Sequence, residues 1–179
     1  MKLWKTLHAS GYYAIQLNHN KIAIETAISC IESIHAQEST NGYGDMVDSA
    51  FIDTMRDWLI ETLLQGAYIR EYHIWEKNVK EYCNIQWALN GNLQPCKWKS
   101  KKSESFIDKT KERLSEFSAS VPLDAINIMR EKTNTAKHCP GLLTEHFVTR
   151  AEYDEAIRAI EVFWETLGQQ ETYRPRSMP

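Results

Sequence analysis

Three residues near position 130 have side-chain types and a spacing that suit phosphate chemistry. Arg130, Asn134 and His138 stand four positions apart in the segment REKTNTAKHCPG, residues 130–141. On an α-helix this spacing puts them along one face. A guanidinium offers a planar donor fork to phosphate oxygens, and an imidazole near a helix C-terminus can exchange protons near neutral pH. We therefore take Arg130, Asn134 and His138 as candidate catalytic residues and Lys137 as a candidate substrate-binding residue.

The helix expected to carry this row has an apolar stripe on the same side. At about 100° per residue, Arg130 lies about 20° from Leu123 and about 40° from Ile126. The polar row thus continues a buried seam, where a cleft or a subunit interface can form. The alternative interpretation is that Arg130 and Lys137 are ordinary cations of a last helical turn and that His138 is a capping residue.

A second candidate site is the densest basic cluster of the chain. It consists of Lys97, Trp98, Lys99, Lys101 and Lys102. Lysines beside a tryptophan are typical of an arm that contacts a nucleic-acid backbone and stacks on a base, so we take all five as candidate substrate-binding residues. The alternative is a solvated linker, and the net charge of −3 means that any nucleic-acid binding depends on a local patch of this kind.

Metal and cofactor sites are not indicated by the sequence. A di-iron helical bundle uses two Glu-x-x-His pairs, and this chain has one, Glu32 with His35. None of the six histidines forms an HxxxH pair, and the only GxG, at 42–44, lies in a turn without a preceding strand. We therefore expect neither a metal nor a cofactor.

Helical periodicity runs through nearly the whole chain, and only 7 glycines and 5 prolines interrupt it. The pattern predicts an all-α fold, a four- or five-helix bundle whose long first two helices are antiparallel. The expected helices span about 3–37, 46–88, 104–118, 120–138 and 150–167. We expect residues 1–167 to form one domain and residues 168–179 to be an unpacked tail.

The same periodicity predicts which side chains are buried and where two helices begin. Thr149 and Glu152 form a capping box for the last helix, while Ser120 or Val121 caps the fourth, with Pro122 in its first turn. In the first helix the expected inward residues are Ile15, Ile22, Ala23, Ala27, Cys30, Ile31 and Ile34. In the second they are Phe51, Met55, Trp58, Leu59, Leu63, Gly66, Ile69, Tyr72, Trp75, Val79, Tyr82 and Cys83. In the last they are Ala156, Ile157, Ile160, Phe163, Trp164 and Leu167.

Composition restricts the class of protein. A hydrophobic fraction of 42% with 25% charged residues is ordinary for a globular chain, and no apolar run is long enough for a membrane span. The four cysteines include no CxxC pair, so we interpret them as reduced thiols and expect a cytoplasmic protein without membrane association.

The helical architecture and the late polar row resemble the HEPN superfamily of small helical bundles. The family motif is an arginine, often followed by a polar residue, with a histidine four to six residues after the arginine. NTAKH, residues 134–138, matches the Asn-x-x-x-His part, while Arg130 stands one turn earlier than the family's arginine. The resemblance implies a homodimer that cleaves RNA without a metal, in a toxin–antitoxin or phage-defence module with a cognate antitoxin or defence partner.

Two alternatives remain beside this interpretation. One is a non-catalytic module of the same build that binds a partner protein or a nucleotide. The other is a bundle with an unrelated small-molecule pocket among the aromatic residues of the second helix, such as Tyr68, Tyr72 and Trp75.

Overall fold

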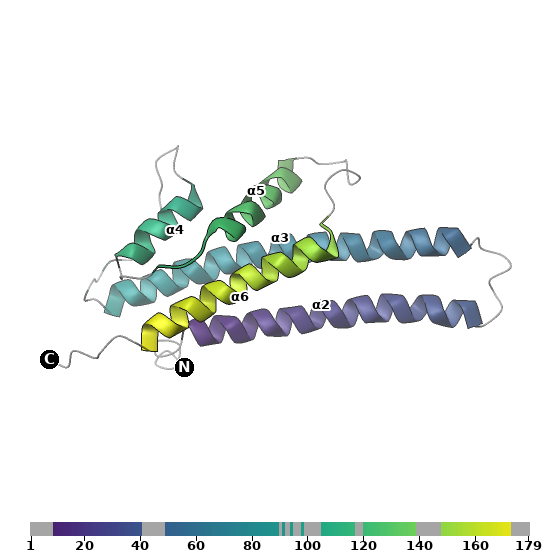
Figure 1. Cartoon of the computed structure of the whole chain (residues 1–179), viewed down its shortest axis with the longest axis horizontal. Coiled ribbons are helices and arrows are strands. Elements are labelled where there is room, and N and C mark those ends of the chain that lie inside the picture. The colour runs from purple at the N-terminus through teal and green to yellow at the C-terminus, as the bar shows by residue number, and fades with distance from the viewer. Residues whose placement is uncertain are drawn as a thin grey trace.

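Five helices and no strand make up the part of the chain that the computed structural model describes (Figure 1). The described residues are 9–40, 49–89, 91, 94, 98, 105–116, 120–138 and 148–172. The helices are α2 (Ala9–Thr40), α3 (Ser49–Leu89), α4 (Phe106–Ser115), α5 (Asp124–His138) and α6 (Arg150–Thr172). The predicted all-α bundle is confirmed, and its first two described helices are the long antiparallel pair that the sequence indicated (Figure 1).

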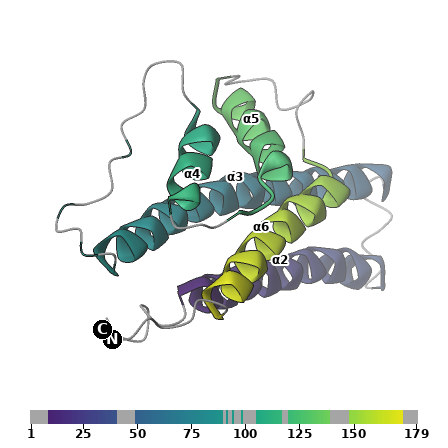
Figure 2. The same ribbon diagram turned by 60° about the vertical axis from the view of Figure 1, so that its left-hand side comes forward.

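The helices form a three-helix core with two shorter helices added to one side. α2, α3 and α6 all pack against one another. α5 packs on α3 and α6, and α4 packs on α3, so that both shorter helices lie on the same side of α3 (Figure 2). α3 is therefore the central element, which contacts each of the other four helices.

Aromatic side chains join these helices at the centre of the core. The ring of Trp75 on α3 meets Phe163 of α6 at 5.4 Å and Phe106 of α4 at 5.9 Å, both edge to face. Tyr13 of α2 contacts Trp164 of α6 at 4.7 Å. Edge-to-face pairs of this kind add to the free energy of apolar burial. All six residues of α6 that the sequence placed inward are buried, which confirms the expected packing face of this helix.

The predicted capping box at the start of α6 is also confirmed. The Thr149 amide donates to Glu152 Oε2 at 2.8 Å, and the Glu152 amide donates to Thr149 Oγ1 at 3.3 Å. Ser105 and Asp108 make the same reciprocal pair at the start of α4. Each box satisfies backbone donors that have no partner within the helix.

The predicted start of α5 is too early, because Ser120 or Val121 was expected as the cap and the helix begins at Asp124. The first helical backbone bond runs from the Asn127 amide to the Leu123 carbonyl at 2.8 Å, so the helix begins at Asp124. Ser120 is held instead by the side chain of Gln170 on α6. The Gln170 amide oxygen accepts from the Ser120 N–H at 3.2 Å, and the amide nitrogen donates to the Ser120 carbonyl at 2.7 Å. The Ser120 N–H and carbonyl, which the predicted cap would have used, are therefore hydrogen-bonded to Gln170.

The contact with Ser120 also lies beyond the predicted end of α6. That helix was expected to stop at 167, but it continues to Thr172. Residues 168–172 of the predicted tail are thus helical, and 173–179 lie outside the described residues.

The predicted buried stripe of α2 is wrong, because none of its described side chains is buried. Ile15, Ile22, Ala23 and Cys30 are exposed, Ala27 and Ile31 are half-buried, and the side chain of Ile34 lies outside the described residues. The residues that enter the core are Tyr13, Leu17, Ile24 and Ile28. α2 carries apolar residues on two opposite faces. The contacts with α3 and α6 decide which of those faces is buried.

In α3 the predicted stripe is correct for one half of the helix and wrong for the other. Tyr72, Trp75, Val79, Tyr82 and Cys83 are buried. The four exposed large residues of the N-terminal half are Phe51, Met55, Trp58 and Leu59. The boundary between the buried and the exposed half of α3 lies near the start of α6. Beyond that point α2 and α3 continue without α6 beside them (Figure 1).

Candidate functional site

The candidate catalytic row lies on α5, and we call Arg130, Asn134 and His138 the α5 polar edge. The buried face of this helix consists of Leu123, Ile126, Met129 and Thr133. Arg130 and Asn134 are half-buried beside that face. The structure therefore agrees with the sequence in one respect: these two polar side chains border the apolar seam.

His138 is the last residue of α5, two turns beyond Arg130. The side chains of His138 and Lys137 lie outside the described residues. The structure thus brings Arg130 and Asn134 to one edge of the helix and sets the His138 backbone at the end of the same helix.

Arg130 makes its polar contacts within its own helix. Its Nε donates to Asn127 Oδ1 at 3.1 Å, and its Nη2 lies 3.5 Å from Glu131 Oε1. The side chain is 23% exposed, and Glu131 is largely exposed. Contacts between partly exposed neighbours on one helix contribute a few tenths of a kcal/mol, so a stronger acceptor such as phosphate can replace them.

The charge of Arg130 also reaches α3 and α4. The pKa of Asp108 on α4 is lowered, chiefly because the Ser105 hydroxyl and amide donate to its carboxylate, and the Arg130 charge acts in the same direction. Burial raises the pKa of Tyr72 on α3 and Glu76 adds to the rise, whereas Arg130 opposes it. Arg130 on α5 is therefore close enough to α3 and α4 for its charge to act on Tyr72 and Asp108.

The basic cluster of residues 97–102 is described only at Trp98. Lys97, Lys99, Lys101 and Lys102 lie outside the described residues. The Trp98 ring is half-buried and stacks on Phe106 with centroids 5.3 Å apart. One face of the indole is therefore occupied by the protein, and a base that stacks on Trp98 must use what remains of its surface.

A buried polar cluster between α2 and α3 was not anticipated from the sequence. Glu71 is 1% exposed and accepts a hydrogen bond from Asn20 Nδ2 at 3.2 Å. Asn78 Nδ2, on the same face of α3, donates to Gln16 Oε1 at 3.1 Å. The sequence nevertheless contains an indication of this cluster. Glu71 directly precedes Tyr72 of the buried stripe, and Glu71 and Asn78, seven residues apart, lie on one face of α3.

The surroundings of Glu71 favour its neutral form. Burial raises the pKa of this carboxyl, and the hydrogen bond from Asn20 and the charge of Arg70 only partly oppose that effect. The Tyr153 hydroxyl on α6 is fully buried without a hydrogen-bond partner, and its pKa is raised by burial and then by Glu71. Glu71, Asn78 and Trp75 also line a cavity of about 10 Å³, which has room for roughly one water.

This cluster is too enclosed to act on a large substrate. Glu71 and Asn78 are buried, Gln16 and Asn20 are half-buried, and the cavity is of water size. Because burial raises the pKa of Glu71, protonation of this carboxyl is coupled to folding.

Other site classes find little support in the described structure. Among the residues it covers, no three histidine, cysteine, aspartate or glutamate side chains are grouped so that they could hold a metal ion. None of the described helices has an apolar segment long enough to cross a membrane. Comparison of the chain with protein-family models, with curated proteins and with solved structures gave no match.

Proposed function

We propose that this chain is a HEPN-like helical-bundle protein that cleaves RNA without a metal ion, acts as a homodimer and belongs to a toxin–antitoxin or phage-defence module. Its catalytic residues are Arg130, Asn134 and His138 of the α5 polar edge. Lys137 and the cluster at 97–102 bind the RNA backbone.

The observation that carries this proposal is the position of Arg130. Its guanidinium is partly exposed at the border of the buried face of α5, and among the described residues it is held by Asn127 and Glu131 of the same helix. Asn134 is half-buried one turn further along. An arginine in that setting can offer its donor fork to a phosphate while its stem remains packed.

The reaction that suits these groups is attack of a ribose 2′-oxygen on the adjacent phosphorus. One His138 imidazole takes the 2′-hydroxyl proton as the new bond to phosphorus forms. The bond from phosphorus to the 5′-oxygen then breaks, and a second imidazole gives that oxygen a proton. Arg130 stabilises the negative charge on the equatorial oxygens. A homodimer supplies both imidazoles from the same position of its two chains.

A second function is favoured by the same contacts of Arg130. Since Asn127 and Glu131 already engage the guanidinium and the net charge is −3, the edge also suits a polar contact with a partner protein or a nucleotide. In that case the chain is a non-catalytic HEPN-like module.

Cleavage of a mixed RNA pool in the presence of EDTA distinguishes the two. We expect the wild type to cleave, His138→Ala to lose about 10²–10⁴-fold in rate, and Arg130→Lys to recover only part of the loss seen in Arg130→Ala. Arg158→Ala is the matched control, because it removes an exposed arginine from α6. Equal turnover by the wild type and His138→Ala excludes catalysis at this site, and activity that returns only with a divalent ion excludes the metal-independent route.

A further inference from the structure

Three cations and an imidazole form a row along one side of α3. They are Arg70, His73, Lys77 and Lys80. On a helix this spacing holds the four side chains within about 80° of one another over about 15 Å. Arg70 and Lys77 are exposed, and the side chains of His73 and Lys80 are 41% and 39% exposed. We call these four residues the α3 row.

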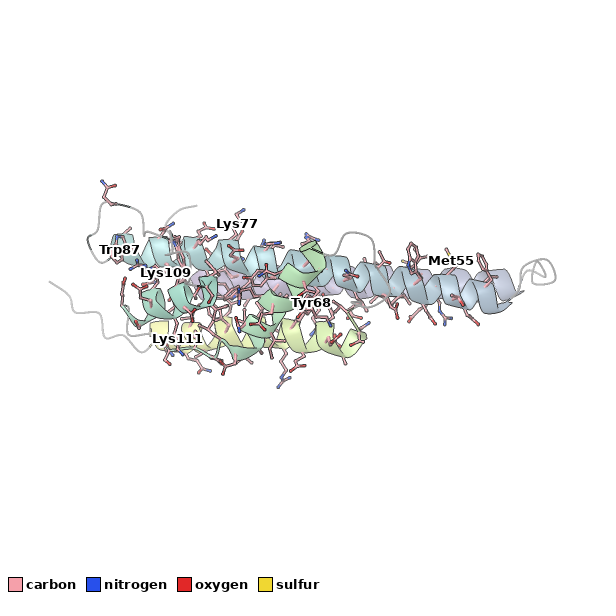
Figure 3. The ribbon with its side chains drawn as sticks, turned by 90° about the horizontal axis from the view of Figure 1, so that it is seen from above. Met55, Tyr68, Lys77, Trp87, Lys109 and Lys111 are labelled. Atoms are coloured by element: carbon pink, nitrogen blue, oxygen red, sulfur yellow. The ribbon has the colours of Figure 1, made fainter. Side chains whose placement is uncertain are left out.

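The α3 row faces solvent on the side of the helix that is opposite to the core. Trp75, which packs against Phe163 of α6, points about 160° away from Lys77. Figure 3 shows Lys77 on the side of α3 away from α6, whereas Lys111 lies on the side of α4 toward α6. A ligand can therefore approach the row without displacing any of the described helices.

The two carboxylates that flank the row are already engaged. Glu76 accepts from Lys80 Nζ at 2.6 Å, and Glu81 accepts a hydrogen bond from the Tyr13 hydroxyl of α2. The other two cations of the row form no ion pair with a described residue. The row is thus a local positive surface on a chain whose net charge is −3, and a local surface is what nucleic-acid binding requires in such a chain.

The row runs close to two groups that the proposed function assigns to RNA. Lys80 Nζ lies 4.8 Å from the centroid of the Phe106 ring, on which Trp98 stacks. Tyr72 belongs to the stretch of α3 that carries the row, and the charge of Arg130 acts on it. The row therefore follows the same part of α3 as Arg130 and ends near Trp98.

We propose that the α3 row binds the phosphate backbone of single-stranded RNA, outside the phosphate that is cleaved. A line of charges on one helix follows one backbone, and its length of about 15 Å corresponds to roughly four stacked nucleotides. Arg70 offers a donor fork to phosphate oxygens, and the two lysines act as point charges. Contacts of this kind read no base edge, so the binding is independent of sequence. The choice of RNA as the polyanion rests on the proposed function.

Fluorescence anisotropy with a labelled 2′-O-methyl RNA of about twelve nucleotides tests the row. The blocked 2′-oxygen has no proton to lose, so the strand is bound without being cleaved. We expect Arg70→Gln combined with Lys77→Gln to reduce the slope of log affinity against log salt by about 1.4, or about 0.7 for each cation. The same variant should bind about tenfold more weakly at physiological salt.

The matched control is Lys111→Gln combined with Arg158→Gln. It removes one exposed lysine from α4 and one exposed arginine from α6, so the change in net charge is the same. This control should keep the wild-type salt slope. Equal losses in the two double variants overturn the proposal, and so does an unchanged slope in the variant of the row.

Glu76→Gln gives a second measurement, in which binding should improve. The substitution removes the carboxylate that accepts from Lys80, so the affinity for the same strand should rise by a few-fold. A gain of affinity cannot result from a damaged fold. Weaker binding by Glu76→Gln contradicts the proposal, because the loss of a nearby carboxylate should favour a phosphate backbone.

An anionic membrane presents similar phosphate groups and is tested with phosphatidylserine vesicles. If the double variant of the row loses binding to the vesicles and keeps its affinity for the RNA, the row is a membrane-binding surface and the proposal is wrong. In cleavage assays the same variant should raise KM and leave kcat nearly unchanged. The proposed function fails when the wild type and His138→Ala turn over RNA equally, whereas this inference fails on the salt slope, so the two failures are distinguishable.

Discussion

Glu71 of α3 and Asn20 of α2 meet inside the core, where the Asn20 amide donates a hydrogen bond to Glu71 Oε2 at 3.2 Å. The bond from Asn78 to Gln16 repeats the arrangement further along the two helices. An α2 shifted by one residue against α3 would take these partners away from Glu71 and Asn78, the two buried members of the pairs. Buried polar pairs of this kind help to specify one register between helices, and their contribution to the free energy of folding is small or unfavourable.

The first prediction concerns Glu71 and pH. Burial raises the pKa of this carboxyl above its ordinary value of 4.5, so the folded chain binds the proton more tightly than the unfolded chain. Stability from this group is fully present below the unfolded pKa and is lost as pH rises through the folded pKa. Each unit of difference costs about 1.4 kcal/mol at higher pH. We expect Glu71→Gln, which keeps an acceptor for Asn20, to flatten the fall of Tm above pH 4.5.

The matched control is Glu61→Gln, which neutralises an exposed carboxylate on the same helix and should retain the wild-type slope. Thermal melts across the acid to neutral range give both slopes. An unchanged slope in Glu71→Gln would show that Glu71 is ionised in the folded protein. The charge of Arg70 acts on Glu71, and Glu71 in turn acts on Tyr153 of α6.

The second prediction concerns the start of α6, where pH acts in the opposite direction. The pKa of Glu152 is lowered, first by Lys132 and then by hydrogen bonds from Thr149. Its contribution is present above the unfolded pKa and is lost as pH falls through the folded pKa. Thr149→Ala should cost about 1 kcal/mol in the free energy of unfolding, as the loss of a cap does.

Thr135→Ala is the control for the capping effect. It removes a threonine hydroxyl that donates to the Glu131 carbonyl on an exposed side of α5. Denaturant unfolding should show a smaller loss for Thr135→Ala than for Thr149→Ala. If the two losses are equal, the capping box contributes little to α6.

The third prediction separates RNA binding by the lysines from packing by Trp98. Replacing Lys97, Lys99, Lys101 and Lys102 together with alanine should reduce the slope of log affinity against log salt by up to about 0.7 per lysine, with the melting temperature unchanged. Trp98→Ala should lower the melting temperature, because the indole stacks on Phe106. A quadruple variant with the wild-type salt slope means that the segment does not touch RNA.

The fourth prediction uses Asn127 to test whether Arg130 is available to phosphate. Asn127→Ala removes the acceptor of Arg130 Nε, so RNA affinity should rise by a few-fold, within the 0.5–1.5 kcal/mol that is typical of one hydrogen bond. Asn127→Asp keeps an acceptor, adds a charge and should lower the affinity. Titration of a labelled RNA measures both. If neither substitution changes the affinity, Arg130 does not contact the RNA.

Local chemistry in the sequence is enough to predict much of the helical frame. The capping box of Thr149 and Glu152 depends on residues three positions apart, and the inward face of α6 follows from one unambiguous apolar stripe. The row of Arg130 and Asn134 beside Leu123 and Ile126 likewise depends only on helical spacing. Interactions of this range are contained in a short segment, and the sequence alone therefore determines them.

Tertiary structure decided what periodicity left ambiguous. α2 has apolar residues on opposite faces, and contacts with α3 and α6 selected Leu17 and Ile24 over Ile15 and Ile22. The apolar residues near the start of α3 lie on nearly the opposite side of the helix from Trp75, which packs against Phe163 of α6, so Met55 is exposed. Glu71 has a buried partner because α2 brings Asn20 to it from 51 residues away in the chain. Burial depends on which distant segment arrives at a face, and helical spacing along a single segment does not contain that information.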